Sequence, residues 1–424
     1  MSGQGLVPKL RFPEYQVAWK QVPLSDVAEI VNERVGDAEC VPYTVTSGTG
    51  LVTQGEKYGR TIAGKSLVNY IRLRKEDFAY NKSATKAYPE GYIARFRGDD
   101  QAAVPNSIFT CFRISVGGVD PAFLDFQFAG NLHGRWLRRL LTVGARAHGS
   151  LNVSDDDLMA LPVPIPAGPS SDAEQRKIAE CLTSLDELIA AEGRKLEALR
   201  THKKGLMQNL FPREGEPTPR LRFPEFHTAG EWGRKPIGDL FDTTSGGTPD
   251  RRKPEYWGLP IPWITTSLVD FNVIHRADEH ITHAGLKNSA AVLFPPGTVL
   301  IAMYGQGKTR GKVALLATEA ATNQACAAIL PSATIDVNYT FLSLCGRYDE
   351  LRRLSNSGGQ ENLSQALVRN LLFAYPTDLK EQQRIASCLG SLDTLITAQT
   401  KKLDTLKTHK QGLMQGLFPL TEGE

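Results

Sequence analysis

The chain has 424 residues, of which 41% are hydrophobic and 22% charged, and its formal net charge is +3. This is ordinary globular composition, and it excludes a polycationic or largely disordered protein. Any nucleic-acid surface must therefore come from local clustering of Lys and Arg. The 6 cysteines are scattered singly, which argues against a zinc site, and no stretch is apolar enough to span a bilayer. We expect a cytoplasmic protein with reduced thiols and no membrane contact.

The first element is a short segment, residues 8–15, that reads PKLRFPEY. It returns as PRLRFPEF at residues 219–226, and each copy is followed by a tryptophan, Trp19 or Trp232. Repetition at such a distance indicates a duplicated architecture. The stretches that follow the two copies show little resemblance to each other, so the duplicated parts enclose two different bodies. We call these bodies the first head and the second head, residues 1–170 and 213–378.

The first head alternates short β-rich runs with turns. Strands are predicted over residues 70–74, 91–97 and 107–115, and helix over residues 121–142. Its basic residues are interleaved with Tyr and Asn, which favours phosphate contacts with base readout between them, although some are ordinary surface charge. Because binding residues are commonly found on loops, we prefer loop positions. The candidate nucleic-acid contacts of this head are Lys57, Tyr58, Arg60, Asn81, Lys82 and Lys86.

Three aspartates in a row, Asp155, Asp156 and Asp157, follow Ser154 near the end of the first head. A nuclease metal site would need carboxylates clustered with a catalytic lysine. Acidic residues directly after a serine and before an apolar segment are instead typical of a helix start. We predict a short helix here and no metal site.

The longest repeated element follows each head. Residues 174–212 read EQRKIAECLTSLDELIAAEGRKLEALRTHKKGLMQNLFP, and residues 381–419 read EQQRIASCLGSLDTLITAQTKKLDTLKTHKQGLMQGLFP. About 25 of roughly 39 positions are identical without a gap. Apolar residues recur in alternating steps of four and three, which predicts one apolar stripe along a helix, as in a coiled coil. Spacer helices, roughly 55 Å long, are therefore assigned to the segments 171–212 and 379–424, with Pro212 and Pro419 as stop signals.

Polar residues interrupt the apolar stripe at matching places. Glu192 and Gln399 occupy one position, and Lys203 and Lys410 another. One hypothesis is an antiparallel pairing offset by one heptad, which places Glu192 opposite Lys410. The same offset places Gln399 opposite Lys203, and such polar pairs can fix the register. The alternative, favoured by full overlap of the helices, is that these long side chains reach solvent.

The second head has a different sequence but a similar mixture of elements. Strands are predicted over residues 261–266, 297–304, 312–317 and 325–330, and helix over residues 339–355. Its basic, aromatic and amide residues suit contacts to phosphates and base edges. The candidates are Arg251, Arg252, Lys253, Tyr256, Tyr304, Gln306, Lys308, Arg310, Lys312 and Gln360.

An apolar run leads into GQGKT at residues 305–309, as a strand leads into a phosphate loop. The Walker A motif requires glycine where Ala302 stands, and the residues after Thr309 predict a strand instead of a helix. We therefore expect a hairpin whose basic turn either contacts nucleic acid or is solvated. Similarly, the glycine turn at residues 358–362 either approaches a groove or begins a helix at Asn362.

Together these segments resemble the specificity subunit of a Type I restriction–modification enzyme. The resemblance rests on the paired helical segments with their THKKGLMQNLFP and THKQGLMQGLFP ends, and on the LRFPEY and LRFPEF starts. Residues 246–269, GGTPDRRKPEYWGLPIPWITTSLV, are similar to the opening of many recognition domains of that family, and residues 71–83, IRLRKEDFAYNKS, to an element of another subgroup. Residues 148–166 and 357–376 resemble the usual exits into the helices. The resemblance covers essentially the whole chain.

The resemblance implies an α/β protein with two globular target recognition domains, separated by two long antiparallel helices that form a coiled-coil spacer with an internal pseudo-two-fold repeat. Each head would read one half of a bipartite, asymmetric site in double-stranded DNA, and the helices would set the spacing and dock two modification subunits. This chain would be non-catalytic and would bind no cofactor itself. S-adenosylmethionine would belong to the modification subunits, and ATP and Mg to restriction subunits that can join the complex.

A different class of function is also compatible with a duplicated helical element. The chain could be a non-catalytic adaptor, whose helices join partners and whose heads bind protein. Dissimilar basic heads on a repeated pair of helices argue against it. An NTPase is the third hypothesis, and Ala302 breaks its only motif.

Overall fold

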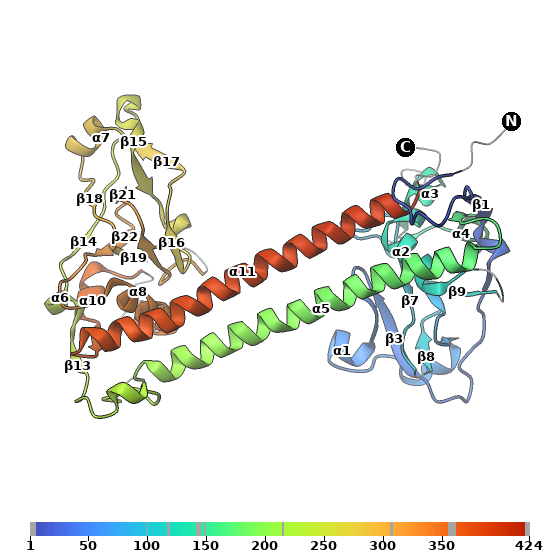
Figure 1. Ribbon diagram of the computed structural model, residues 1–424, viewed down its shortest axis with the longest axis horizontal. Helices are drawn as coiled ribbons and strands as arrows, with labels where there is room; N and C mark the ends of the chain where they lie inside the picture. Colours follow the sequence, from blue (N-terminus) through green and yellow to red (C-terminus); the bar gives the residue numbers. More distant parts are fainter. Residues whose placement is uncertain are drawn as a thin grey trace. The chain divides into compact units, whose positions relative to one another are not determined.

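The computed structural model describes residues 6–99, 101–115, 117, 119–140, 146–147, 150–213, 216–305, 308–354 and 362–419. The chain divides into two compact units (Figure 1): residues 1–193 with 402–424, and residues 194–401. Each unit contains one head together with parts of both long helices, α5 (Ser171–Leu210) and α11 (Leu379–Leu417). The predicted fold class, sheet-containing heads on a duplicated long helix, is confirmed.

The first head contains two larger sheets, with strand orders β2-β9-β6-β7 and β4-β3-β8-β5. The first sheet is formed by β2 (Ala28–Ile30), β9 (Phe109–Ile114), β6 (Phe78–Asn81) and β7 (Tyr92–Arg95), and the second by β4 (Gly50–Thr53), β3 (Val41–Thr46), β8 (Ala102–Val104) and β5 (Ile71–Leu73). The smaller elements are β1 (Lys20–Pro23) with β12 (Pro162–Ile165), β10 (Arg146–Ala147) with β11 (Ser150–Leu151), and the helices α1 (Gln54–Tyr58), α2 (Pro121–Ala129), α3 (Leu132–Leu140) and α4 (Asp155–Met159).

Strand β6 shows how this head is packed, because successive side chains of a strand point to opposite faces. Phe78 and Tyr80 belong to the core that contains the buried faces of α2 and α3. Ala79, between them, belongs to a separate core made with β3, β5 and β8. The strand is therefore covered on both faces, which explains why its side chains are buried throughout.

The second head is organised around the sheets β14-β22-β19-β20-β16 and β17-β15-β21-β18. The first is formed by β14 (Thr243–Ser245), β22 (Cys326–Ile329), β19 (Val299–Ala302), β20 (Val313–Leu316) and β16 (Asn272–Ile274), and the second by β17 (Glu279–Ile281), β15 (Trp257–Ile264), β21 (Ala320–Thr322) and β18 (Leu293–Phe294). The smaller elements are β13 (Gly233–Pro236) with β23 (Leu372–Tyr375), and α6 (Ile237–Leu240), α7 (His283–Lys287), α8 (Val337–Gly346), α9 (Tyr348–Leu354) and α10 (Gln365–Asn370). Along β19, Val299 and Ile301 join one core while Leu300 joins another.

The spacer helices lie antiparallel within each unit (Figure 1). In the first unit Asp186 of α5 pairs with Lys410 of α11 at 2.5 Å. In the second unit the repeat supplies the same residues with exchanged roles, because Lys203 of α5 pairs with Asp393 of α11 at 2.5 Å. The repeated Asp of SLD and the repeated Lys of THK are thus each other's partners.

These pairs correct both hypotheses about the interrupted apolar stripe. The one-heptad offset is wrong, because Lys410 contacts Asp186 while Glu192 pairs with Lys402 at 2.5 Å. The alternative, that the lysines reach solvent, is incomplete: the side chains of Lys203 and Lys410 are 22% and 20% exposed, and each ends at an aspartate that is itself 45% or 36% exposed. Each of these lysines is paired with an aspartate of the opposite helix beside the apolar seam.

The repeated residues at the start of each helix fasten it to its head. Arg11 of the LRFPEY segment donates two hydrogen bonds of 2.8 Å to the buried carboxylate of Glu174, in the first turn of α5. Arg222 of the second copy holds Glu381 in the same way, at 2.7 Å. Such bidentate pairs fix an orientation as well as a distance.

The glutamine after each of these glutamates reaches into the head. The side-chain oxygen of Gln175 accepts a hydrogen bond from the backbone N–H of Asp120, the residue that caps α2. In the second unit Gln382 accepts from the backbone N–H of Asp336, which caps α8. The duplicated EQ dipeptide therefore connects each spacer helix to the helix that packs against its head's sheet.

The LRFPEY and LRFPEF segments also hold the other end of the helix pair. The backbone N–H of Leu10 donates to the carbonyl of Gly416, near the end of α11, at 2.8 Å. The equivalent Leu221 donates to Asn209, near the end of α5, also at 2.8 Å. Each segment thus joins the start of one helix to the end of the other. In the described part of the chain no helix combines the length and apolarity needed to cross a membrane.

Candidate nucleic-acid interface

The best-placed candidates of the first head lie on helix α1, which follows β4, and on the turn after it; the expectation of loop positions is therefore wrong for Lys57 and Tyr58. We call α1 and the residues that follow it, up to Ala63, the braced loop. Thr53 caps α1 and forms a reciprocal capping box with Glu56, and Gly59 ends the helix with φ +69°. The buried side chain of Gln54 accepts hydrogen bonds from the backbone N–H groups of Ile62 and Ala63. This bracing leaves the candidate side chains on the outside of the loop: Lys57, Tyr58 and Arg60.

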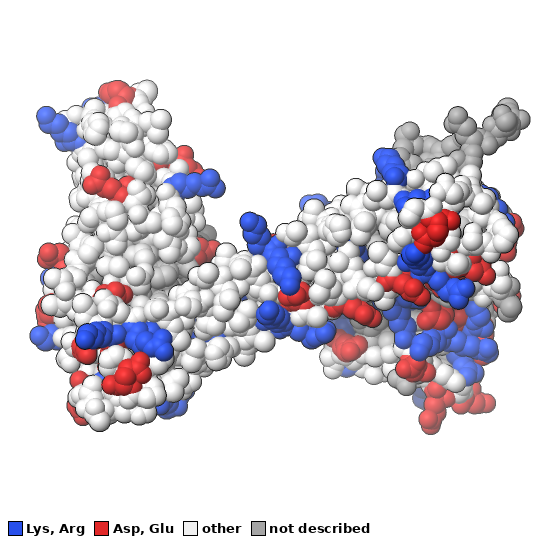
Figure 2. Space-filling model, in the orientation of Figure 1, with Lys and Arg blue, Asp and Glu red and all other residues white. Residues whose placement is uncertain are grey.

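Most other cations of the first head are already neutralised. Glu33 receives both Arg72 and Arg74, and Asp125 receives both Arg95 and Arg97. Figure 2 shows the result, with blue and red side chains intermixed over the first head. Among the described residues Lys57, Arg60 and Lys86 form no ion pair, so their charges remain available to an anionic ligand.

Asn81 and Lys82 have structural partners. Asn81 is buried; its amide donates to the carbonyl of Val45 and accepts from the N–H of Ser83. Lys82 lies 3.7 Å from the carboxylate of Asp155. The structure therefore gives these two residues a role in holding the head together, and it brings neither to the loop that carries Lys57.

In the second head the basic loop before β15 is internally paired. The Arg251 guanidinium lies 3.7 Å from the ring centre of Trp257 and also forms an ion pair with Glu279. Arg252 binds Asp250 and lowers the pKa of that carboxyl to about 2. Exposed pairs of this kind are weak, so these cations can exchange a carboxylate for a phosphate.

The next two candidates, Lys253 and Tyr256, contact each other. Lys253 donates to the hydroxyl of Tyr256 at 3.1 Å, and its ammonium also lies 4.9 Å from the centre of that ring. Tyr256 is buried, which fixes where Lys253 sits. Of the two, Lys253 is the exposed one.

The stretch around GQGKT is the expected hairpin. Strands β19 and β20 pair antiparallel, with Leu300 opposite Ala314. A strand therefore follows Thr309 where a phosphate loop requires a helix, which removes the NTPase hypothesis. Tyr304 and Lys308 are exposed at the turn, while Lys312 pairs with Asp270 at 2.6 Å and Arg310 is partly buried.

Two candidates, Gln306 and Gln360, lie outside the described residues. Of the two alternatives left open for the glycine turn at residues 358–362, a helix that starts at Asn362 is not present. Helix α10 begins at Gln365, and Ser364 caps it by accepting a hydrogen bond from the N–H of Leu367. By contrast, the short helix predicted at Asp155 is present as α4, capped by Ser154. The described residues contain no cluster of His, Cys, Asp or Glu suited to a metal ion.

Parts of the chain are similar to known proteins of one family. Residues 229–408 match the Type I restriction modification DNA specificity domain. The Type I restriction enzyme MjaIX specificity subunit of Methanocaldococcus jannaschii is 29% identical over 44% of this chain and 44% of its own length. The EcoR124I/EcoR124II specificity subunit of Escherichia coli is 26% identical over 63% of this chain and 64% of its own length.

The fold agrees over a longer stretch. The crystal structure of the Type I restriction–modification S subunit from M. genitalium matches with a TM-score of 0.59 and 14% identity, covering 98% of this chain and 100% of that one. Residues 229–408 thus match the family's DNA specificity domain, and the fold of the chain is similar to that of a Type I restriction–modification S subunit. The aligned sequence still spans only about half to two thirds of the two curated relatives named above.

One feature of the candidate interface was missed by sequence reasoning. Gln54 braces the loop of Lys57 and Arg60 from inside, but a lone glutamine near a predicted turn carries no signal of its own. Its role depends on where Ile62 and Ala63 return in space. The family match supports the DNA-reading hypothesis over the adaptor hypothesis.

Proposed function

We propose that this chain is the DNA-reading, non-catalytic component of a Type I restriction–modification complex. Each head reads one half of a bipartite, asymmetric site in double-stranded DNA, and the paired helices set the distance between the halves. The observation that carries the proposal is the duplicated attachment. Arg11 with Glu174 and Arg222 with Glu381 fix two unlike heads to the helices by the same geometry.

The contact residues we propose are those that combine charge or ring surface with exposure. In the first head these are Lys57, Tyr58, Arg60 and Lys86, and in the second Arg251, Arg252, Lys253, Tyr304 and Lys308. Basic side chains next to exposed rings suit phosphate contacts flanked by base contacts. We leave out Asn81 and Tyr256, because both are buried.

Two modification subunits would bind the duplicated helical part, because a repeated surface offers the same partner two equivalent sites. They would supply S-adenosylmethionine and the methyl transfer. Restriction subunits that use ATP and Mg would join for cleavage. The chain itself would hold the DNA and need no cofactor.

The test is to express the chain with the modification subunit encoded beside it and to map methylated adenines across a genome. The expected result is one split motif with a fixed gap. Removing seven residues from each spacer helix, chosen to keep the Asp186–Lys410 and Lys203–Asp393 pairs, should change the gap and leave both half-sites unchanged. Methylation at unrelated sequences, or a gap that stays the same, would refute the proposal.

A further inference from the structure

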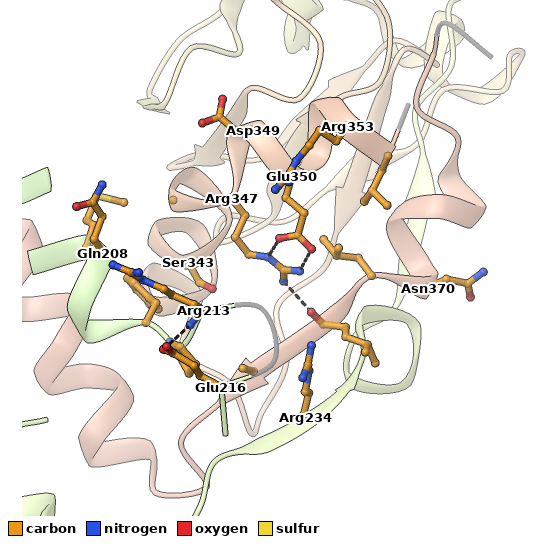
Figure 3. A pocket seen from close by; sticks show the side chains of 18 of the residues that line it. Gln208, Arg213, Glu216, Arg234, Ser343, Arg347, Asp349, Glu350, Arg353 and Asn370 are labelled. Atoms are coloured by element: carbon orange, nitrogen blue, oxygen red, sulfur yellow. Dashed lines mark hydrogen bonds and ion pairs between the residues drawn. The ribbon is translucent and has the colours of Figure 1, made fainter. Parts of the chain in front are cut away.

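The second unit contains a hollow of about 580 Å³ at the end of α5. Met207, Gln208 and Phe211 of the repeated GLMQNLF stretch form one wall, and the end of α8, with Ser343 and Gly346, forms another. Figure 3 shows Gln208 on one side and the Arg347–Glu350 pair on another. None of the described candidate DNA contacts lines this hollow.

The first unit contains a counterpart of about 680 Å³ at the end of α11. Its walls come from Met414, Gln415 and Phe418, which repeat Met207, Gln208 and Phe211, and from the end of α2, with Gln127 and Gly130. The helical walls are alike because the sequence is duplicated. The other walls come from heads that show little resemblance in sequence.

A shared detail shows that the heads nevertheless form the same shape. In the second unit the methyl carbon of Met207 lies 3.5 Å from where a Cβ on Gly346 would be. In the first unit the methyl carbon of Met414 lies 3.9 Å from the corresponding point on Gly130. Both glycines come at the end of the helix that the EQ dipeptide connects to the spacer. In both units the repeated methionine thus lies within ordinary van der Waals distance of the glycine at the end of this helix.

More basic than acidic side chains line each hollow. The first is lined by Lys9, Arg135, Lys407 and Lys410, of which Lys410 is already paired with Asp186, and no carboxylate is among its described lining residues. The second is lined by Arg213, Arg234, Arg347 and Arg353 and also by the carboxylates of Glu216, Asp349 and Glu350. Arg347 is bound to Glu350 at 2.7 Å, whereas Arg234 and Arg353 are exposed. A ligand that fits both must present an apolar group to the methionine and negative charge to the basic side chains.

We propose that the two hollows are equivalent docking sockets, each for the same segment of a partner protein: an apolar side chain flanked by carboxylates. This rests on the proposed function, in which the modification subunit is the partner that binds twice. Methionine suits the inner wall because its flexible thioether adapts to an inserted apolar group. The repeated GLMQ-x-LFP ends are then kept for binding as well as for packing.

The experiment fills one socket at a time with a bulky side chain at an exposed position. Gln208→Trp and Gln415→Trp are made singly and together, and the number of modification subunits per specificity subunit is measured by native mass spectrometry. Thr201→Trp and Thr408→Trp are matched controls, because they are exposed on the same helices and line neither hollow. Circular dichroism shows that each variant keeps its helices.

We expect two bound subunits for the unaltered chain and the controls, one for each single variant, and none for the double variant. Charge reversal among the lining residues, with Arg234→Glu in one socket and Lys407→Glu in the other, should weaken binding at least tenfold at the altered socket. Two bound subunits in every variant would overturn the sockets while leaving the proposed function intact. The sockets would also be overturned if the Thr201→Trp and Thr408→Trp controls lost bound subunits to the same extent, or if the socket variants lost only DNA binding. Failure of the unaltered chain to bind any modification subunit would instead overturn the proposed function.

Discussion

The guanidinium of Arg222 holds the carboxylate of Glu381 with paired hydrogen bonds of 2.7 Å, and the side chain of Glu381 is only 1% exposed. Removing one partner of a buried pair leaves the other charged and desolvated, at a cost of about 3–5 kcal/mol. We therefore predict that Arg222→Ala lowers the free energy of unfolding of the second unit by that amount. Urea unfolding followed by circular dichroism measures it.

The control is Arg220→Ala, which removes an exposed pair with Glu216 and should cost less than about 1 kcal/mol. Adding Glu381→Gln to Arg222→Ala should recover part of the loss, because a neutral amide is cheaper to bury than a carboxylate. Equal effects of the two arginine variants would show that Glu381 is not isolated from water.

The reciprocal pairs between α5 and α11 predict a charge-swap result. Asp186→Lys places a lysine beside Lys410, and we expect the free energy of unfolding to fall by about 1 kcal/mol. The double variant Asp186→Lys with Lys410→Asp restores attraction and should regain most of this loss. A double-mutant cycle by thermal unfolding gives the coupling energy. If the effects of the two substitutions simply add, the pair does not contribute to the register.

His133 makes the first unit sensitive to acid. Its ring is buried, with one nitrogen 3.3 Å from the carbonyl of Gly91, and burial lowers its pKa from 6.5 to about 4. Between these values the unfolded chain binds a proton that the folded chain does not, so stability falls as the pH falls. From pH 7 to pH 5.5 we expect a loss of about 1 kcal/mol from this group. In His133→Gln this part of the pH dependence should disappear, although the overall stability is lower. The measurement is urea unfolding at a series of pH values. If the free energy of unfolding depends on pH as strongly in His133→Gln as in the unaltered chain, His133 is not the group responsible.

The braced loop of the first head predicts a specific salt effect on DNA binding. In the complex with the modification subunit, Lys57→Ala and Arg60→Ala should each weaken binding and reduce the slope of log K against log salt concentration by about 0.9. The control is Lys75→Ala, an exposed lysine that is already paired with Asp99. Fluorescence anisotropy over a range of salt concentrations provides the measurement. If Lys75→Ala changes the slope of log K against log salt concentration by the same amount, the residues of the braced loop do not contact DNA more than other surface lysines do.

The elements with local signals could be predicted from the sequence. Spacer helices α5 and α11 follow from the apolar stripe and the prolines, and the β19–β20 hairpin follows from two apolar runs around a glycine-rich turn. The short helix α4 follows from Ser154 and its aspartates. In each case the residues that decide the structure are neighbours in the chain.

The register and the charge state of the candidate surface could not be predicted in the same way. Several acidic residues of α5 are possible partners of Lys410 in the sequence. Which of them pairs with it, here Asp186, depends on how both helices pack against the heads. Arg72 and Arg74 look free in the sequence, yet Glu33 lies across from them in space. Asn81 resembles a loop reader, but the carbonyl it binds belongs to β3, far away in the chain.

The doubled attachment by Arg11, Glu174 and Gln175, and by Arg222, Glu381 and Gln382, also bears on how such a gene can change. The Arg–Glu pairs are made by residues that both copies share, and the side-chain oxygens of Gln175 and Gln382 accept from backbone N–H groups of the heads. If recombination within the repeated stretches exchanged one head for another, the new head would therefore form the same bonds to the spacer helices. New target sequences could then arise in a single genetic event, without waiting for a matching change elsewhere in the protein.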